Sequence, residues 1–292
     1  MNTPTPVHTP KSILITGGTG SFGQAFVRFL LRKKNVERIC VYSRGEHAQA
    51  AMQAQFTDSR LRWMIGDVRN LSRLTRAMQG VDTVIHAAAL KRIEVGAYNP
   101  DEMALTNVIG TMNVVEAACN ARSVARVVGL STDKAYAPIS PYGLSKGLAE
   151  AILLAANVTH AGGPKFAVTR YGNVTGSQGS VIPKWKALAE QGKPIILTDS
   201  DCTRFHMTMD EAVNMVWKLA NTFKTELVIP DWLPAYRLGD LAKAFRDEYC
   251  IEVREVGLPK FEKLHESMNA ELCSKTARRL QRQELIELIK NV

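Results

Sequence analysis

The chain has 292 residues, of which 46% are hydrophobic and 22% are charged, and a formal net charge of +9. This length accommodates a nucleotide-binding domain with a smaller lobe, and the composition is that of a soluble globular protein. The apolar runs are too short for a membrane-spanning helix and no nucleic-acid-binding motif accompanies the basic charge, so we expect neither a membrane nor a nucleic acid as partner.

The first ten residues, MNTPTPVHTP, contain three prolines and no apolar stretch long enough for a signal peptide. We therefore expect a disordered leader over residues 1–10 and a cytoplasmic location. The five cysteines lack Cys-x-x-Cys spacing, so they support neither a disulfide framework nor a metal site.

Predicted strands and helices alternate along most of the chain. Short apolar, β-branched runs predict strands, and apolar residues at helical spacing predict helices. The expected strands are 11–18, 38–44, 62–68, 82–89, 125–133, 165–174, 194–201 and 226–231. The expected helices are 21–34, 71–80, 107–121, 141–160, 180–193 and 209–222. This alternation is typical of an α/β fold with a Rossmann-type, doubly wound parallel sheet.

The regular alternation weakens after residue 173, where the loops lengthen and the segments shorten. We therefore predict a dinucleotide-binding domain over residues 11–173, completed by segments near 200–230. Residues 174–292 are expected to form mainly a small C-terminal substrate-binding lobe. Two basic stretches, 28–34 and 275–283, have helical spacing and are interpreted as solvated helix faces.

A glycine-rich turn, TGGTGSFG, joins the first predicted strand to the first predicted helix. The spacing of Gly17, Gly20 and Gly23 allows a tight turn and lets the backbone approach a pyrophosphate at the helix N-terminus. The pattern predicts a dinucleotide site. The remaining residues of this turn that we expect at the cofactor are Thr19, Ser21 and Phe22.

The end of the second predicted strand bears on the choice of dinucleotide. An acidic residue there would bind a ribose hydroxyl, whereas an arginine would accept a 2′-phosphate. Ser43 and Arg44 occupy this position and favour NADP, although the nearby Glu46 keeps NAD as the less favoured alternative.

The third and fourth predicted strands end in residues suited to the same cofactor. Asp67 and Val68 are placed to border an adenine ring. Ala87, Ala88 and Ala89 are small enough to let the backbone approach the middle of the dinucleotide.

Side chains that transfer protons gather after the fifth predicted strand. Thr132, Asp133 and Lys134 stand at the strand end, where ligands of open α/β sheets bind. Tyr142 and Lys146 follow at Tyr-x-x-x-Lys spacing, which places them on one face of a helix. Because an ammonium beside a phenol lowers the pKa of the phenol, Tyr142 is predicted to act as a base near neutral pH.

Together these motifs resemble the extended short-chain dehydrogenase/reductase superfamily. The shared features are the glycine turn, GDV at Asp67, HAAA at His86, TN at Asn107 and YxxxK at Tyr142. Within that superfamily, STDKA, YGLSK, VTRYGNVTGSQGSVIP and EKLHE resemble the inverting UDP-N-acetylglucosamine 4,6-dehydratases of pseudaminic acid synthesis. The resemblance implies NADP as cofactor, a UDP-sugar as substrate and a homo-oligomeric protein.

The resemblance also implies the catalytic roles. Tyr142, held as a phenolate by Lys146, would take the proton of the sugar 4-hydroxyl while hydride moves from C4 to the cofactor. Lys134 would then remove the C5 proton, Asp133 would help to protonate the departing C6 hydroxyl, and Thr132 would hydrogen-bond the 4-oxygen. Hydride would return to C6, and reprotonation would invert C5. A lysine can be this base only if burial or a neighbouring cation lowers its pKa.

The resemblance extends to further binding positions. Asn107, Tyr171 and Asn173 are implied at the cofactor. The residues implied at the substrate are Lys91, Asn173, Ser177, Ser180, Val181, Lys186, Thr203, Arg204 and Glu266.

The sequence departs from the family pattern at two places. Relatives usually read RPGEKLHE, whereas this chain reads GLPKFEKLHE, so the arginine and glycine of that turn are absent. Lys260 or Lys263 could replace the missing charge. Tyr136 stands where the inverting dehydratases have a small residue.

Three alternative functions stay open at the level of sequence. One is a UDP-sugar 4-epimerase, which the Asp133–Lys134 pair disfavours because simple epimerases need no C5 base. Another is a dehydratase with 5-epimerase activity, and such proteins tend to lack the tyrosine found here at Tyr142. The last is a non-catalytic NADP-binding sensor, which has no reason to combine these side chains with Lys146.

Overall fold

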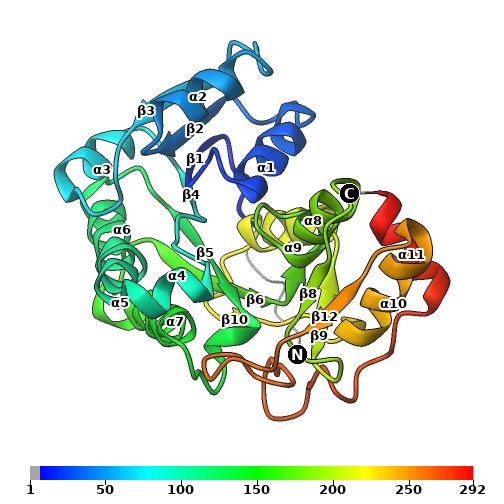
Figure 1. The fold of residues 1–292 in the computed structure, drawn as a ribbon. Coiled ribbons are helices and arrows are strands. Elements are labelled where there is room, and N and C mark those ends of the chain that lie inside the picture. Colours follow the sequence, from blue (N-terminus) through cyan, green and yellow to red (C-terminus); the bar gives the residue numbers. More distant parts are fainter. Residues whose placement is uncertain (1–6, 292) are drawn as a thin grey trace.

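The structure is a computed structural model that describes residues 7–291. A parallel sheet with helices packed around it forms the larger part of the molecule (Figure 1). Within that range the sheet has seven strands in the order β10-β6-β5-β4-β1-β2-β3. The strands are β1 (Ser12–Thr16), β2 (Arg38–Ser43), β3 (Leu61–Ile65), β4 (Thr83–His86), β5 (Arg126–Thr132), β6 (Lys165–Tyr171) and β10 (Leu227–Val228). The strand order reverses between β1 and β4, so a crevice opens at the carboxyl ends of these two strands.

Helices cover both faces of this sheet, because successive strand residues are apolar on both sides. Ile13 and Ile15 of β1 pack in one core, whereas Leu14 packs in the core of the opposite face. The first core also takes residues from α1 (Ser21–Leu31), α2 (Glu46–Gln53) and α9 (Met209–Ala220). The second takes residues from α3 (Leu71–Ala77), α6 (Gly110–Asn120) and α7 (Pro141–Thr159). The predicted Rossmann-type, doubly wound fold is confirmed.

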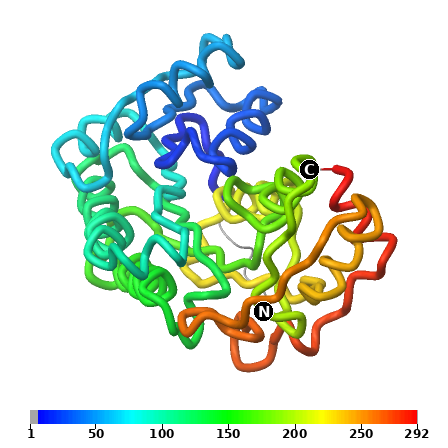
Figure 2. Tube along the Cα trace, in the orientation of Figure 1, coloured from blue at the N-terminus to red at the C-terminus, as the bar shows by residue number. Residues whose placement is uncertain are grey.

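The smaller C-terminal lobe has its own core beside the main sheet (Figure 2). Trp185 and Phe245 meet edge to face in this core, with ring centroids 5.7 Å apart. The lobe's elements are β7 (Asn173–Val174), α8 (Val181–Glu190), β8 (Ile195–Leu197), β9 (Thr203–Met207), β11 (Ala235–Arg237), α10 (Leu238–Tyr249), β12 (Val253–Glu255) and α11 (Arg282–Lys290). The strands pair as β11-β9-β7 and β12-β8.

The intervening segment 209–228 returns to the main sheet. Helix α9 packs against α1 and the sheet, and β10 pairs with β6. We therefore propose the same division of the chain as the sequence suggests, with residues near 200–230 completing the dinucleotide-binding domain.

Short helical segments connect β4 to the second layer of helices. They are α4 (Ile93–Tyr98), α5 (Pro100–Met103) and the π-helical segment η1 (Ala104–Ile109), which continues into α6. A 3₁₀ turn, η2 (Asp133–Ala135), follows β5. The expected helix over 107–121 therefore starts as a π-helical segment. The basic stretch 275–281 is not helical, contrary to the prediction, and α11 begins only at Arg282.

The expected disordered leader is wrong for residues 7–10. Val7 forms an isolated bridge with Thr222, and the buried His8 ring lies 2.8 Å from the Thr83 hydroxyl. The ring of His8 also packs against Phe223, so burial and hydrogen bonding hold this segment on the protein. Residues 1–6 of the predicted leader lie outside the described residues.

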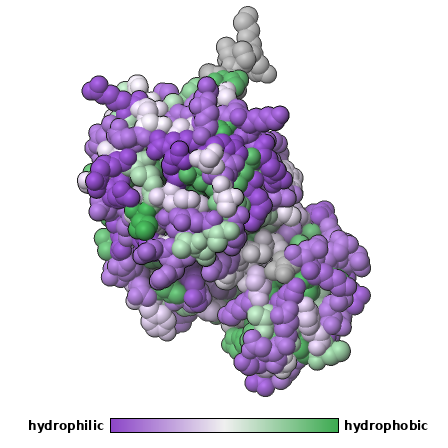
Figure 3. All heavy atoms as spheres, turned by 90° about the horizontal axis from the view of Figure 1, so that it is seen from above, coloured by the Kyte–Doolittle hydropathy of each residue, from purple (hydrophilic) through white to green (hydrophobic). Residues whose placement is uncertain are grey.

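The surface in Figure 3 is mainly hydrophilic, with hydrophobic residues scattered between charged ones. Across residues 7–291, the helices are either too short or too polar to traverse a bilayer.

Candidate active site

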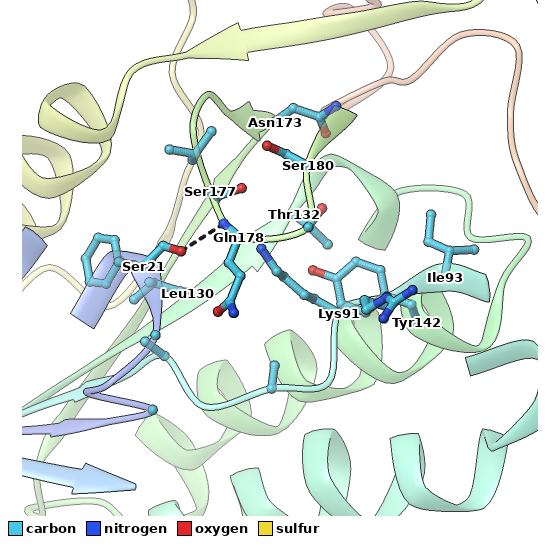
Figure 4. A pocket seen from close by; sticks show the side chains of 18 of the residues that line it. Ser21, Lys91, Ile93, Leu130, Thr132, Tyr142, Asn173, Ser177, Gln178 and Ser180 are labelled. Carbon is cyan, nitrogen blue, oxygen red and sulfur yellow. Dashed lines mark hydrogen bonds between the residues drawn. The ribbon is translucent and has the colours of Figure 1, made fainter. Parts of the chain in front are cut away.

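A cavity of about 870 Å³ lies at the carboxyl ends of the parallel strands, where the lobe faces the sheet (Figure 4). Most of the residues predicted from sequence line it. On the sheet side these are Gly17, Thr19, Gly20, Ser21, Phe22, Gly23, Ser43, Arg44, Asp67, Val68, Ala87, Ala88, Ala89, Lys91, Thr132, Lys134, Tyr142, Lys146 and Tyr171. On the lobe side they are Asn173, Ser177, Ser180, Val181 and Arg204. Because parallel strands end at one edge, residues distant in sequence meet in one crevice.

The glycine turn forms one wall of the cavity, and its geometry requires glycine. Gly17 has φ of 67°, and a Cβ there would lie 2.8 Å from the Ala88 Cα. A Cβ at Gly23 would lie 2.4 Å from the Gly18 carbonyl oxygen. The turn therefore packs directly on the end of β4 and leads into the N-terminus of α1, a geometry that suits a pyrophosphate.

Two arginines and one carboxylate stand at the β2 and β3 end of the cavity. Asp67 lies 3.8 Å from Arg44 and pairs with Arg69 at 2.8 Å. Burial acts to raise the pKa of Asp67, but hydrogen bonds from Arg69 and the charges of both arginines lower it. The Arg44 side chain is about half exposed, which leaves its guanidinium accessible to a ligand.

The end of β5 and the η2 turn carry a buried pair of opposite charges. Lys134 Nζ donates to Asp133 Oδ1 at 3.1 Å and to Asn173 Oδ1 at 3.3 Å. It also lies 3.5 Å from Glu266 Oε1. Burial acts to lower the pKa of Lys134, but the charges of Asp133 and Glu266 outweigh it, and the pKa is raised. The sequence-based condition for a basic Lys134, a lowered pKa, is therefore not met in this arrangement.

The start of α7 places Tyr142 and Lys146 on the cavity. The Ser140 hydroxyl accepts from the Gly143 amide at 3.1 Å and caps the helix, so the tyrosine stands in its first turn. Lys146, one turn later, donates to the Leu130 carbonyl at 2.6 Å. Burial lowers the pKa of Lys146 to about 8, although a nearby carboxylate opposes the shift.

The expected lowering of the tyrosine pKa by Lys146 is not found. Burial raises the pKa of Tyr142 to about 12, because a phenolate is poorly solvated there. The charge of Lys134 and the hydroxyl of Thr132 act in the opposite direction. The interactions that favour a phenolate at Tyr142 thus come mainly from Lys134 and Thr132, near the end of β5, rather than from Lys146.

Five of the predicted site residues do not line the cavity, within the described part of the chain: Asn107, Asp133, Lys186, Thr203 and Glu266. Asn107 is buried; its side chain accepts from the Leu90 amide and donates to Ser145 Oγ, tying the loop after β4 to α7. Thr203 is also buried and bonds the Ser274 hydroxyl at 2.7 Å. These two support the wall from behind.

Several lining residues were not predicted. They are Tyr42, Gly66, Thr106, Gln178, Lys184, Trp185, Ile196, Thr198, Met209, Leu238, Pro259, Phe261 and Glu262, among others. Lys184 and Trp185 lie one helical turn after Val181, a spacing that could have identified them. The lobe residues from Ile196 onward carry no such signal.

The loop 177–180 lies between the glycine turn and the side chains of Thr132 and Tyr142 (Figure 4). The Gln178 amide donates to Ser21 Oγ at 2.9 Å across the cavity (Figure 4). Lys91 and Tyr142 also point into this space in the same view. The cavity therefore has one end suited to a dinucleotide and another end formed by the lobe.

Comparison with known proteins bears on this geometry. Residues 13–287 match the model of a family described as polysaccharide biosynthesis protein. The chain belongs to this family. It is 41% identical, over 88% of its length and 77% of the relative's, to a UDP-N-acetylglucosamine 4,6-dehydratase (inverting) of Campylobacter jejuni. It is 40% identical, with the same coverage, to a UDP-glucose 4-epimerase of Rickettsia massiliae.

Solved structures show the same architecture. The Pen protein of Bacillus thuringiensis superposes with a TM-score of 0.92 at 30% identity, over 97% of this chain and 98% of the other. The dTDP-glucose 4,6-dehydratase DesIV of Streptomyces venezuelae, solved with NAD and TYD bound, superposes with a TM-score of 0.83 at 25% identity. That match covers 96% of each chain. The resemblance to extended short-chain dehydrogenases/reductases and to inverting dehydratases is confirmed.

Proposed function

We propose that this protein is an NADP-dependent, 5-inverting UDP-N-acetylglucosamine 4,6-dehydratase. The observation that carries the proposal is the buried Asp133–Lys134 pair, of which Lys134 lines the same cavity as Tyr142 and Lys146. The product would be a UDP-2-acetamido-2,6-dideoxy-4-keto-hexose with inverted C5.

The first step is oxidation at C4. Tyr142 takes the proton of the 4-hydroxyl, and the Thr132 hydroxyl bonds the same oxygen. A dinucleotide held by the glycine turn and Arg44 would supply the hydride acceptor for this step and, in its oxidised form, a positive charge. Such a charge favours the phenolate of Tyr142, whose pKa burial otherwise raises.

The second step eliminates water across C5 and C6. Transfer of one proton from Lys134 Nζ to Asp133 Oδ1, 3.1 Å away, yields a free amine and a carboxylic acid. Burial raises the pKa of Asp133 and favours this exchange, while Lys134 itself opposes it. The amine takes the C5 proton and the acid protonates the C6 hydroxyl, which leaves as water. The hydride taken from C4 would then be returned to C6, and a proton from solvent would add to the opposite face of C5.

The cofactor is proposed to be NADP because Ser43 ends β2 and Arg44 directly follows it at the cavity. Arg44→Gln should weaken NADP binding about 10-fold or more and leave NAD binding within about twofold, since the lost contact is with a phosphate. Calorimetric titration of both dinucleotides checks this. Arg62→Gln, an exposed arginine of β3, is the matched control. Equal losses for both dinucleotides would remove the case for a 2′-phosphate contact.

The UDP portion of the substrate is assigned to the lobe side of the cavity. Ser177, Ser180 and Val181 lie at the start of α8, and Arg204 on β9 reaches the same space. Arg204 pairs with Glu262 at 3.3 Å, which partly neutralises it where the family's basic turn is absent. Direct contacts of Asn107, Lys186, Thr203 and Glu266 with ligands stay predictions, as does the cytoplasmic location.

A UDP-sugar 4-epimerase is the second candidate, because a relative of nearly equal identity has that name. An epimerase needs Tyr142 and Lys146 but has no use for a base at C5. The Asp133–Lys134 pair therefore favours the dehydratase.

Incubation with UDP-N-acetylglucosamine in deuterated water, followed by NMR of the product, distinguishes the two. We expect a 4-keto-6-deoxy sugar with deuterium at an inverted C5. Inversion at C4 without loss of water would establish the epimerase and overturn the dehydratase. Tyr142→Phe should lower the rate by about 10²- to 10⁴-fold, the usual contribution of a general base. Tyr98→Phe, at a highly exposed tyrosine, should have no effect.

We also propose a homo-oligomer, built on an apolar surface of α6 and α7. Large apolar side chains that are 40–59% exposed lie on this surface: Leu105 and Ile109 of η1, which leads into α6, Met112 of α6, and Leu144 and Leu148 of α7. Helix α7 packs against both η1 and α6, and monomeric proteins rarely expose several large apolar side chains on neighbouring elements.

A further inference from the structure

Residues 262–266 lie against the turn that carries the catalytic pair, although they belong to the C-terminal lobe. Lys263 Nζ donates to the Tyr136 carbonyl at 2.7 Å. The same amine lies 3.2 Å from Glu266 Oε2, while Glu266 Oε1 lies 3.5 Å from Lys134 Nζ. A chain of alternating charges thus connects the lobe to Asp133 through Lys134.

Glu266 is held rigidly on its far side. Its amide donates to Ser274 Oγ at 2.9 Å, and the Ser274 amide donates back to the Glu266 carbonyl at 2.7 Å. Thr203 bonds the same serine hydroxyl. With only 2% of its surface exposed, Glu266 has little freedom to adopt another rotamer. The carboxylate is therefore fixed relative to Lys134.

Neither Lys263 nor Glu266 lines the cavity, as far as residues 7–291 define it. This differs from the sequence-based expectation of a nucleotide contact for Glu266. Lys263 contacts the Tyr136 carbonyl and Glu266 lies beside Lys134, so both side chains support the turn that carries the pair.

The turn that they hold needs external support. Ala137, directly after Tyr136, has φ of 42°, in the left-handed region that non-glycine residues avoid. The guanidinium of Arg170 lies 5.9 Å from the centre of the Tyr136 ring. Lys263 and Arg170 thus fix Tyr136 by its carbonyl and its ring, and this gives a structural use to a residue that is unusual in the family.

We propose that Lys263 and Glu266 are positioning residues that hold the Lys134 amine and the turn 133–136 in place for the elimination step. This inference rests on the proposed function, because elimination is the step that uses Lys134. Oxidation at C4 depends on Tyr142 and Lys146 of α7. The charge of Lys134 also acts on Tyr142, but this through-space effect tolerates a small displacement of the amine better than a proton transfer does.

Separate measurement of the two steps in single-turnover experiments tests the proposal. Oxidation is followed by the absorbance of reduced nicotinamide on the enzyme, and elimination by entry of solvent deuterium at C5. In Lys263→Met and Glu266→Gln we expect oxidation within about twofold of the unaltered enzyme and elimination slowed about 10- to 100-fold, the effect of a misplaced catalytic group. KM for the UDP-sugar should stay within about twofold.

Three further variants sharpen the test. Lys263→Arg should restore elimination, since it keeps the charge. Lys243→Met, at an exposed lysine of α10, should change neither step. The double variant Lys263→Met/Glu266→Gln should be no slower than the worse single variant, because the two residues act as one unit. Normal oxidation in each variant shows that it is folded.

The contrary outcomes are distinct. An increased KM with unchanged elimination would make Glu266 a nucleotide contact and overturn the inference alone. The inference alone would also be overturned if oxidation and elimination slowed equally, or if the rate of elimination did not change. An unaltered enzyme that forms no dehydrated product would overturn the proposed function and the inference with it.

Discussion

The pKa of Lys146 leads to a prediction for how the rate of C4 oxidation depends on pH. Its pKa is lowered to about 8 by burial, and the charge of Glu150 limits that shift. The ammonium is present below this pKa and is lost above it. In the proposed C4 oxidation the ammonium of Lys146 adds positive charge to the cavity that holds Tyr142, so the rate should fall as the pH rises through about 8.

Glu150→Gln should move this descending limb to lower pH, because it removes the charge that raises the pKa of Lys146. The rate of cofactor reduction as a function of pH is the measurement. The free energy of unfolding should also fall, by up to about 3–5 kcal/mol, since Glu150 forms a buried ion pair with Arg170. Glu116→Gln, exposed on α6, is the control. The role of Lys146 would be contradicted if the rate of cofactor reduction fell at the same pH in Glu150→Gln as in the unaltered protein.

For single residues, the sequence predicted well which side chains line the cavity, but it predicted their pKa values poorly. Position at a strand end is enough to place Asp67 or Thr132, because parallel strands end together. The pKa of Lys134 depends on Glu266, which a loop of the lobe brings near it. No local pattern encodes that contact.

The turn between β1 and α1 is the element whose geometry is most closely set by residue type. Gly23→Ala places a Cβ 2.4 Å from the Gly18 carbonyl, within a backbone that cannot move without displacing the helix. We expect the free energy of unfolding to fall by about 1–3 kcal/mol, as for other overpacked sites, and dinucleotide binding to weaken. Chemical denaturation and cofactor titration measure both.

Gly45→Ala is the matched control for this substitution. A Cβ there would lie 3.5 Å from the nearest atom, an ordinary contact, and φ is −82°. Its stability should therefore change little. Equal destabilisation by both substitutions would show that close packing of the turn is not the cause.

Among the elements, buried parallel strands were the most predictable, because each is a continuous apolar run between turn residues. The lobe was harder. Its strands β8 and β12 have three residues each, too short for periodicity to separate them from loops. The basic stretch 275–281 has helical spacing but forms a loop; the Arg279 side chain there donates to the Ser274 and Lys275 carbonyls. Tertiary contacts override the local pattern there.

At the scale of the whole molecule, the exposed apolar surface of α6 and α7 predicts an interface with a second copy of the protein. The two helices pack side by side, and exposed residues follow one another at helical spacing along α7: Leu144, Leu148, Ala151 and Ala155. Small alanines beyond the leucines allow another helix to approach closely. Two copies related by a twofold axis would pair the same surface with itself, so that each apolar side chain is covered in both.

Leu144→Glu/Leu148→Glu should therefore convert a dimer into a monomer, because four carboxylates would meet at the twofold axis in place of four leucines. Light scattering after size-exclusion chromatography gives the mass of each species. Val256→Glu, at a lobe residue that is 63% exposed, changes the same chemistry outside this surface and should remain dimeric. A monomeric unaltered protein, or a double variant with undiminished mass, would contradict the proposed interface. Since α7 also carries Tyr142 and Lys146, dissociation would free the back of the catalytic helix, and the monomer should oxidise its substrate more slowly than the dimer.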